Sequence, residues 1–135
     1  MQNALYDKGR EAFLDGLISW TSMTIRAVLV DTTYYTPSLS GHMWLSDIDV
    51  SARIAISGPF DQKTITGGVA DADDIVFTAV TGPLCNAVVI YRDTGTASTS
   101  RLIACITNAA GLPIVPSGHD IKLQWDSGDN RIFRL

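Results

Sequence analysis

The chain has 135 residues, of which 46% are hydrophobic and 18% charged, so it is long and apolar enough to fold as one domain. Its net charge is −4 and its ten Lys and Arg residues are scattered, which argues against a nucleic-acid-binding surface. Thirteen of the fourteen acids are Asp. Because Asp favours turns whereas Glu favours helix interiors, the composition predicts many turns and little helix.

The N-terminal stretch MQNALYDKGREAF is mixed and charged, which is unlike a signal peptide. No apolar run approaches the roughly 20 residues of a membrane span. We therefore expect a soluble chain, made in the cytoplasm, that binds neither nucleic acid nor membrane.

Residues 4–15 form the one good helix candidate. Leu5, Ala12 and Phe13 fall on one helical face, and Gly16 follows where a C-cap glycine would stand. Gly9 weakens the prediction because glycine is unfavourable inside a helix.

Residues 24–31 are rich in β-branched side chains and predict a strand. Its two faces alternate, with Arg26, Val28 and Val30 on one side and Ile25, Ala27 and Leu29 on the other. Residues 32–44 contain Pro and Gly and predict a loop, and residues 45–48 predict one short helical turn.

From residue 50 onward, short apolar runs alternate with Gly, Pro, Asp, Asn and Ser, the residues that turns require. The predicted strands are 52–57, 63–69, 75–81, 87–92, 101–106, 121–125 and 131–134. The last two read as a closing hairpin whose terminal strand pairs in the sheet. The fold predicted for residues 1–135 is mainly β: a single-domain antiparallel β-sandwich or barrel of about eight strands. Residues 1–20 supply a short helical segment that packs on the sheet or on a neighbouring subunit.

Three acids in four positions, Asp71, Asp73 and Asp74, precede the apolar run IVFTAV. An EF-hand counted from Asp71 would need Gly at its sixth position and Glu at its twelfth, where the chain has Val76 and Gly82. We expect a solvated turn whose charges also keep the aggregation-prone segment IVFTAV from associating with other chains. A looser Ca²⁺ site using Asp71 and Asp73 is the weaker alternative, and no cofactor is predicted.

The other reactive residues form no catalytic motif. Cys85 and Cys105 lie beside or within apolar runs and are expected to be buried free thiols, with a disulfide as the alternative. His42 and His119 belong to no zinc pattern, and the chain contains neither G-x-S-x-G nor a P-loop. We predict no catalytic residue and no enzymatic activity.

The loop 32–44 concentrates aromatic side chains among polar residues. Such a loop can close over its own core, bind another protein, or stack against a sugar through Tyr35 and Trp44. The N-terminal segment offers the same choice between its own sheet and a partner. The candidate interface residues are Phe13, Trp20, Tyr34, Tyr35, His42 and Trp44.

Several stretches together resemble one family of small structural proteins from the virion gene clusters of tailed phages or prophages. They are a GREAF segment at 9–13, a W-x-S-x-T-I-x-A-V-L-V-D strand at 20–31, a YTP loop at 35–37 and an LSDI turn at 45–48. Three later stretches, GVADADDIVFTAVTG, VVIYRDTGTASTSRLIA and DSGDNRIFRL, look like the second half of the same pattern. Met23 departs from it, because Asp is expected there.

The resemblance implies a virion component rather than an enzyme, and it carries over no functional residue. It points to a capsid decoration (cement) protein, with a tail or tail-tip subunit as the alternative. A carbohydrate-binding β-sandwich is a further alternative from a different class. The implied partners are the major capsid protein or other virion subunits, and a homo-oligomer, with a trimer favoured. Avidity on a symmetric shell would multiply modest contacts.

Overall fold

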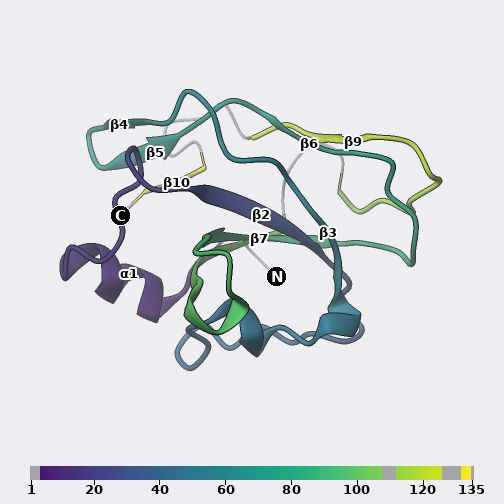
Figure 1. The fold of residues 1–135 in the computed structure, drawn as a ribbon, viewed down its shortest axis with the longest axis horizontal. Coiled ribbons are helices and arrows are strands. Elements are labelled where there is room, and N and C mark those ends of the chain that lie inside the picture. The colour runs from purple at the N-terminus through teal and green to yellow at the C-terminus, as the bar shows by residue number, and fades with distance from the viewer. Residues whose placement is uncertain (1–3, 108–111, 126–131, 135) are drawn as a thin grey trace.

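The computed structural model describes residues 4–107, 112–125 and 132–134 (Figure 1). Within these ranges the chain forms ten short strands, one α-helix and three 3₁₀ turns, and every strand pairing is antiparallel. The predicted mainly β, antiparallel fold is confirmed. None of the helices in the described ranges is long and apolar enough to cross a membrane.

A central sheet of five strands organises the molecule. Its order is β1-β8-β7-β2-β3, so β1 and β3 are its edges. The strands are β1 (Ala4–Leu5), β2 (Ile25–Val30), β3 (Arg53–Ile56), β7 (Ala87–Arg92) and β8 (Arg101–Ile106). The bounds predicted for β7 and β8 are confirmed, and β2 and β3 lie one residue inside theirs at each end.

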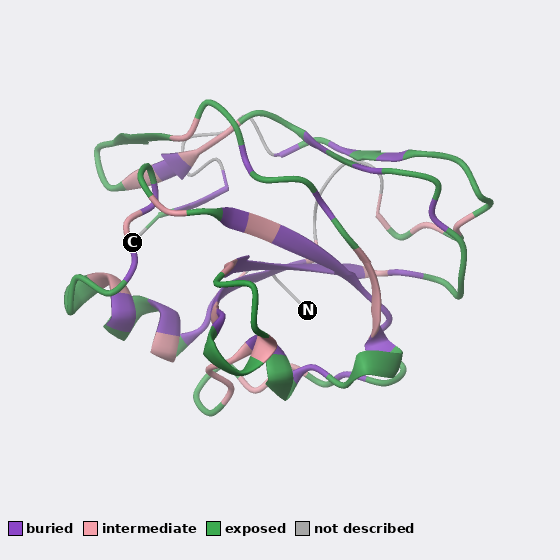
Figure 2. Ribbon diagram, in the orientation of Figure 1, coloured by how far each residue is buried: buried purple, intermediate pink, exposed green. Residues whose placement is uncertain are grey.

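Both faces of this sheet are covered, which explains why β7 and β8 read as continuous apolar runs (Figure 2). Ile25, Ala27 and Leu29 of β2 belong to one hydrophobic core, whereas Val28 and Val30 belong to a second. The alternation predicted for residues 24–31 is therefore confirmed, but its two faces serve two separate cores.

Two smaller sheets cover one face of the central sheet (Figure 1). One has the order β10-β5-β4, and the other pairs β6 with β9. Their strands are β4 (Thr64–Thr66), β5 (Val69–Asp71), β6 (Ile75–Phe77), β9 (Ile121–Leu123) and β10 (Phe133–Arg134). Together with the central sheet they make a β-sandwich.

The opposite face is covered by α1 (Asp7–Leu14) and by the segment 31–52 (Figure 1). That segment contains η1 (Leu45–Asp47), the predicted helical turn, and η2 (Val50–Ala52). A third turn, η3 (Ala97–Thr99), lies in the connection between β7 and β8. The sandwich thus has a third, largely irregular layer, in which the N-terminal helix and the loop 32–44 both pack on the central sheet.

Helix α1 ends as predicted. The N–H of Gly16, at φ 76°, donates to the Phe13 carbonyl, and the N–H of Leu17 donates to the Ala12 carbonyl. These two bonds make a Schellman motif. The start of the predicted helix was wrong, because residues 4 and 5 pair with Cys105 and Ala104 of β8. The helix itself packs on β8, so the N-terminal segment docks on its own sheet.

Two other predictions were wrong. Residues 63–69 are not one strand: β4 and β5 form a hairpin, with Gly67 and Gly68 both at positive φ in a two-residue turn. The last two strands do not form a hairpin either. Strand β9 pairs with β6, whereas β10 pairs with β5, so they belong to different sheets. Pairing of the terminal strand in a sheet is confirmed.

Candidate functional site

A pocket of about 360 Å³ opens beside the edge strand β3, between the central sheet and the β7–β8 connection. It lies on the face of the sheet that the segment 31–52 covers. Three strands, η1 and the connection all contribute to its wall. The lining residues are Arg26, Leu45, Arg53, Ile56, Tyr91, Asp93, Gly95, Thr96, Ala97 and Ser100.

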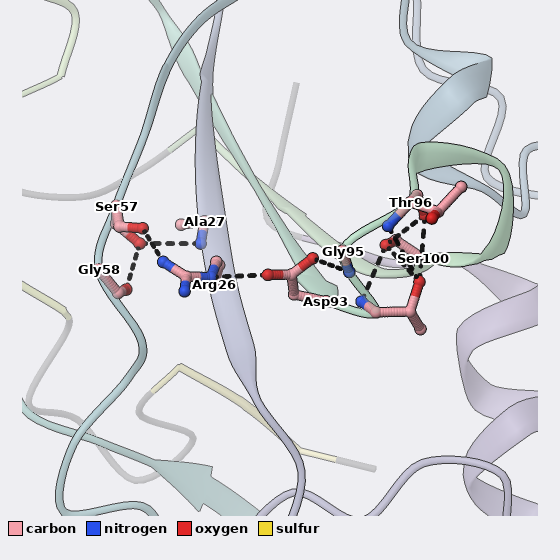
Figure 3. Close-up of polar contacts among 9 residues, drawn as sticks. Arg26, Ala27, Ser57, Gly58, Asp93, Gly95, Thr96 and Ser100 are labelled. Carbon is pink, nitrogen blue, oxygen red and sulfur yellow. Dashed lines mark hydrogen bonds and ion pairs between the residues drawn. The ribbon is translucent and has the colours of Figure 1, made fainter.

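Arg26 of β2 spans the pocket wall (Figure 3). Its Nε donates to Oδ2 of Asp93 at 2.7 Å, and its Nη1 donates to the Ser57 carbonyl at 3.1 Å. The Ser57 hydroxyl accepts the Ala27 N–H at 3.0 Å and donates to the Gly58 carbonyl. Arg26 therefore joins the chain leaving β3 to the chain leaving β7, and its remaining N–H groups have no hydrogen-bond partner among the described residues.

The β7–β8 connection is held by its own side chains. Oδ1 of Asp93 accepts the N–H of Gly95 at 2.8 Å, which is an Asx turn completed by a glycine at φ 86°. Ser100 is fully buried, and its hydroxyl accepts the Thr94 N–H and donates to the Thr96 carbonyl. These bonds give the pocket a preorganised rim.

Arg53 and Tyr91 also line the pocket, and both have hydrogen-bond donors that no described residue uses. Nε of Arg53 is buried and has no hydrogen-bond partner among the described residues. Tyr91 is 1% exposed, and burial raises the pKa of its hydroxyl to about 12, with smaller contributions from Asp93 and, in the opposite direction, from Arg26 and Arg53. At neutral pH the hydroxyl is therefore protonated and can donate a hydrogen bond.

The predicted interface residues of the N-terminal segment lie inside or against the core. Trp20 is 2% exposed and packs edge-on against Phe60 and Phe133, so it offers no contact area to a partner. Its prediction as an interface residue is corrected for that reason. Phe13 is half-buried and packs against Phe133 at a ring distance of 6.0 Å.

In the loop 32–44, the aromatic residues have different roles. Tyr35 is 4% exposed, and its hydroxyl contacts the Tyr6 hydroxyl at 2.6 Å and His42 Nδ1 at 3.0 Å. Trp44 is half-buried, with the Arg101 guanidinium 4.6 Å from its ring centroid. Tyr34 is exposed. Because Tyr35 closes over the core, as one of the three alternatives foresaw, it cannot form a sugar platform with Trp44, and its prediction as an interface residue is corrected.

The segment 71–74 supplies hydrogen-bond acceptors to two tryptophans. The Asp71 carbonyl accepts the Trp20 indole N–H, and the Asp73 carbonyl accepts that of Trp125, both at 3.1 Å. Oδ1 of Asp74 accepts the Trp125 backbone N–H at 3.0 Å. Asp73 and Asp74 are exposed, as expected of a solvated turn, while Asp71 is half-buried. Within the described ranges no three His, Cys, Asp or Glu residues lie close enough to hold a metal ion.

The two cysteines are buried free thiols, as predicted, and lie in different cores. Burial raises the pKa of each from 9.0 to about 11. For Cys105 a hydrogen bond with Tyr6 acts in the opposite direction. His119 is exposed, as expected of a surface histidine.

The pocket arginines were missed by sequence reasoning, although one signal was present. Arg26 shares a strand face with Val28 and Val30, and a guanidinium on a face that is otherwise buried needs a specific partner. No local pattern connects Arg26 to Arg53 or to Asp93, because 67 residues separate Arg26 from Asp93.

Comparison with known proteins adds no identification. No model of a known protein family matches the sequence, and no curated protein matches it significantly. The resemblance to phage virion proteins stays a prediction.

Proposed function

We propose that this protein is a non-enzymatic structural component of a tailed-phage virion that acts as a capsid decoration protein. Two features support the proposal. The first is the sequence resemblance, which spans nearly the whole chain. The second is that the layer formed by α1 and the segment 31–52, here called the α1 layer, exposes large apolar side chains although both faces of the central sheet are already covered.

The exposed apolar side chains carry the structural part of this proposal. Leu14 at the end of α1 is 82% exposed, and Leu17, three residues on, is 45% exposed. The same layer exposes Tyr34, Leu39 and Val50. The helix is tied to this loop through the Asp7 N–H, which donates to the Leu39 carbonyl at 2.7 Å. Covering these side chains with a partner gains roughly 25 cal/mol per Å² of apolar area.

Binding to assembled shells tests the proposal directly. Purified protein is added to capsids that lack it, taken from the phage that encodes it, and bound protein is measured after sedimentation. We expect saturable binding and a higher capsid disruption temperature. No cosedimentation would reject the role in the shell.

Paired variants locate the contact. Leu14→Ser with Leu17→Ser removes apolar area from the α1 layer, whereas Ile65→Ser removes it from β4 in the opposite layer, where Ile65 is 58% exposed. The double variant should weaken capsid binding and the Ile65 variant should not. Equal loss in both would place the contact elsewhere.

Immunogold labelling of virions distinguishes the shell from the tail. Label on tails and not on capsids would favour the tail-subunit alternative. Light scattering of the purified protein tests the proposed homo-oligomer, for which a trimer of about 44 kDa is three times the chain mass of 14.6 kDa.

A further inference from the structure

We propose that the pocket between Arg26, Arg53 and Tyr91 binds a carboxylate group, either of a small free acid or of an Asp or Glu side chain on a partner. Carboxylate binding here does not require that the protein belong to a virion.

The donors in this pocket exceed the acceptors that the fold supplies. Arg26 uses Nε and Nη1 on Asp93 and Ser57, and its other N–H groups have no acceptor within the part of the chain that the structure describes. The Arg53 guanidinium makes no hydrogen bond among the described residues, and its Nε is buried. A buried N–H without an acceptor costs free energy, so a ligand oxygen that reaches it is stabilised.

The acids around the pocket are already engaged. Asp93 accepts from both Arg26 and Gly95. Asp49, the acid whose charge acts on Arg53, accepts the backbone N–H and the hydroxyl of Ser51 at 2.9 and 2.7 Å. Among the described residues, neither carboxylate accepts a hydrogen bond from the Arg53 guanidinium.

The charge balance selects the class of ligand. Two guanidinium groups and one carboxylate line the pocket, which leaves one net positive charge among the lining residues; Asp49 lies outside the lining and is exposed, so solvent screens its charge. A carboxylate ligand neutralises the net positive charge. A phosphate dianion would leave a surplus negative charge beside Asp93, which costs free energy at low dielectric.

The donor groups of the pocket suit the same ligand. The planar guanidinium of Arg53 can donate two parallel bonds to a carboxylate, the usual bidentate arrangement. Tyr91, from β7, adds a protonated hydroxyl. Figure 3 shows Arg26 extended between Ser57 and Asp93, which fixes the second guanidinium on one wall.

Titration with two carboxylates tests the proposal. ¹⁵N-labelled protein is titrated with sodium acetate and with N-acetyl-glutamate N-methylamide, and chloride is adjusted to hold ionic strength constant. We expect saturable shifts of the Arg53 and Arg26 Nε–H signals and of the amides of Gly95 and Thr96. Binding of both ligands identifies a site that accepts a protein side chain, whereas binding of acetate alone restricts it to small acids.

Matched variants separate the pocket from overall charge. Arg53→Gln should weaken binding about tenfold or more, since it removes a charge-assisted pair. Arg134→Gln removes the same charge from an exposed position on β10 and should leave binding unchanged. If Arg53→Gln does not fold, Tyr91→Phe gives the second test, with weaker binding expected.

Three results would overturn the proposal. Shifts that grow linearly without saturation indicate non-specific screening. Equal carboxylate affinity of the wild type and the Arg53→Gln variant would show that the ligand does not bind in this pocket. Tighter binding of phosphate than of acetate at pH 7.5 contradicts the assignment to a carboxylate.

Discussion

The side chains of Tyr6, Tyr35 and His42 form a continuous line of hydrogen bonds from the core toward the surface. The Ser38 N–H donates to His42 Nδ1 at 3.1 Å, so this nitrogen is an acceptor and the Tyr35 hydroxyl donates to it. The Tyr6 hydroxyl can then donate to Tyr35. The Tyr35 phenol thus ties the loop 32–44 to the strand-and-helix junction at Tyr6, in addition to the backbone bond from the Asp7 N–H to the Leu39 carbonyl.

Removing that phenol oxygen should destabilise the protein. Tyr35→Phe deletes the middle member of the line and leaves Tyr6 without one of its partners. We expect the free energy of unfolding to fall by about 1–2 kcal/mol, measured by urea denaturation. The neighbouring Tyr34→Phe, at an exposed position, should change it by less than about 0.5 kcal/mol. Equal effects at both positions would contradict the assigned role of the buried phenol.

The acids at 71–74 allow a second comparison between neighbours. Asp74→Ala removes the acceptor of the Trp125 N–H, and we expect a loss of about 1–2 kcal/mol in thermal or urea denaturation. Asp73→Ala removes a side chain that makes no hydrogen bond to any of the described residues, while keeping the carbonyl that accepts the Trp125 indole N–H. It should therefore be nearly neutral. A Ca²⁺-dependent rise in Tm that Asp73→Ala abolishes would instead support the metal site.

At the scale of elements, the contact of α1 with β8 depends on one glycine. A Cβ built on Gly9 would lie 2.7 Å from the Leu102 carbonyl oxygen and 3.1 Å from the Ile103 Cα, both backbone atoms. Backbone cannot move aside as a flexible side chain does. Gly9 is therefore required for the close approach of the helix to the sheet, despite its low helix propensity.

Replacing Gly9 with alanine tests whether the cost of overpacking exceeds the gain in helix propensity. Alanine gains up to about 1 kcal/mol in helix propensity, but overpacking typically costs about 1–3 kcal/mol. We expect Gly9→Ala to lower Tm. Gly58→Ala, where an added Cβ meets no atom within 4 Å and φ is not positive, is the control and should leave Tm unchanged or slightly higher. A Gly9→Ala protein with a raised Tm would show that α1 does not approach β8 this closely.

At the scale of the whole molecule, the two cores share one sheet and bury titratable groups on both of its sides. Cys85 lies in one core, and Cys105, Tyr6, Tyr35 and Tyr91 lie in the other. Burial is the largest cause of every raised pKa in this set. The folded protein therefore holds these protons at pH values where the unfolded chain releases them.

This difference predicts alkaline destabilisation. Unfolded thiols lose their protons near pH 9 and unfolded phenols near pH 10, while the folded thiols titrate near 11 and Tyr35 and Tyr91 near 12. Since the unfolded state then binds fewer protons, the free energy of unfolding falls as pH rises from about 9 to about 12. It should be insensitive to these groups below pH 9.

Calorimetry from pH 7 to pH 11.5 in the presence of a reductant checks this expectation. Cys105→Ala removes one of the groups and should make the fall in Tm between pH 9 and pH 11 shallower. A wild-type Tm that stays level across that interval would contradict the burial of these groups.

Local patterns anticipated much of the central sheet. Turn residues flank the apolar runs at 87–92 and 101–106. Strands β7 and β8 begin and end where these two runs do. The Gly16 C-cap was readable because it depends on a few neighbouring residues. The β4–β5 hairpin was missed, although Gly67-Gly68 is a turn signal. The threonines and the valine around the two glycines have the pattern of one continuous strand.

Three features of this protein followed from its sequence alone: a mainly β domain, the alternating faces of β2, and the glycine that ends α1. All three depend on backbone preferences and side-chain periodicity within a few residues. Tertiary structure decided that β9 and β10 join different sheets, that Trp20 and Tyr35 close over cores, and that Arg26, Arg53 and Tyr91 meet in one pocket. Those outcomes depend on contacts between residues far apart in the chain, where burial and hydrogen-bond satisfaction choose among partners that local sequence leaves equivalent.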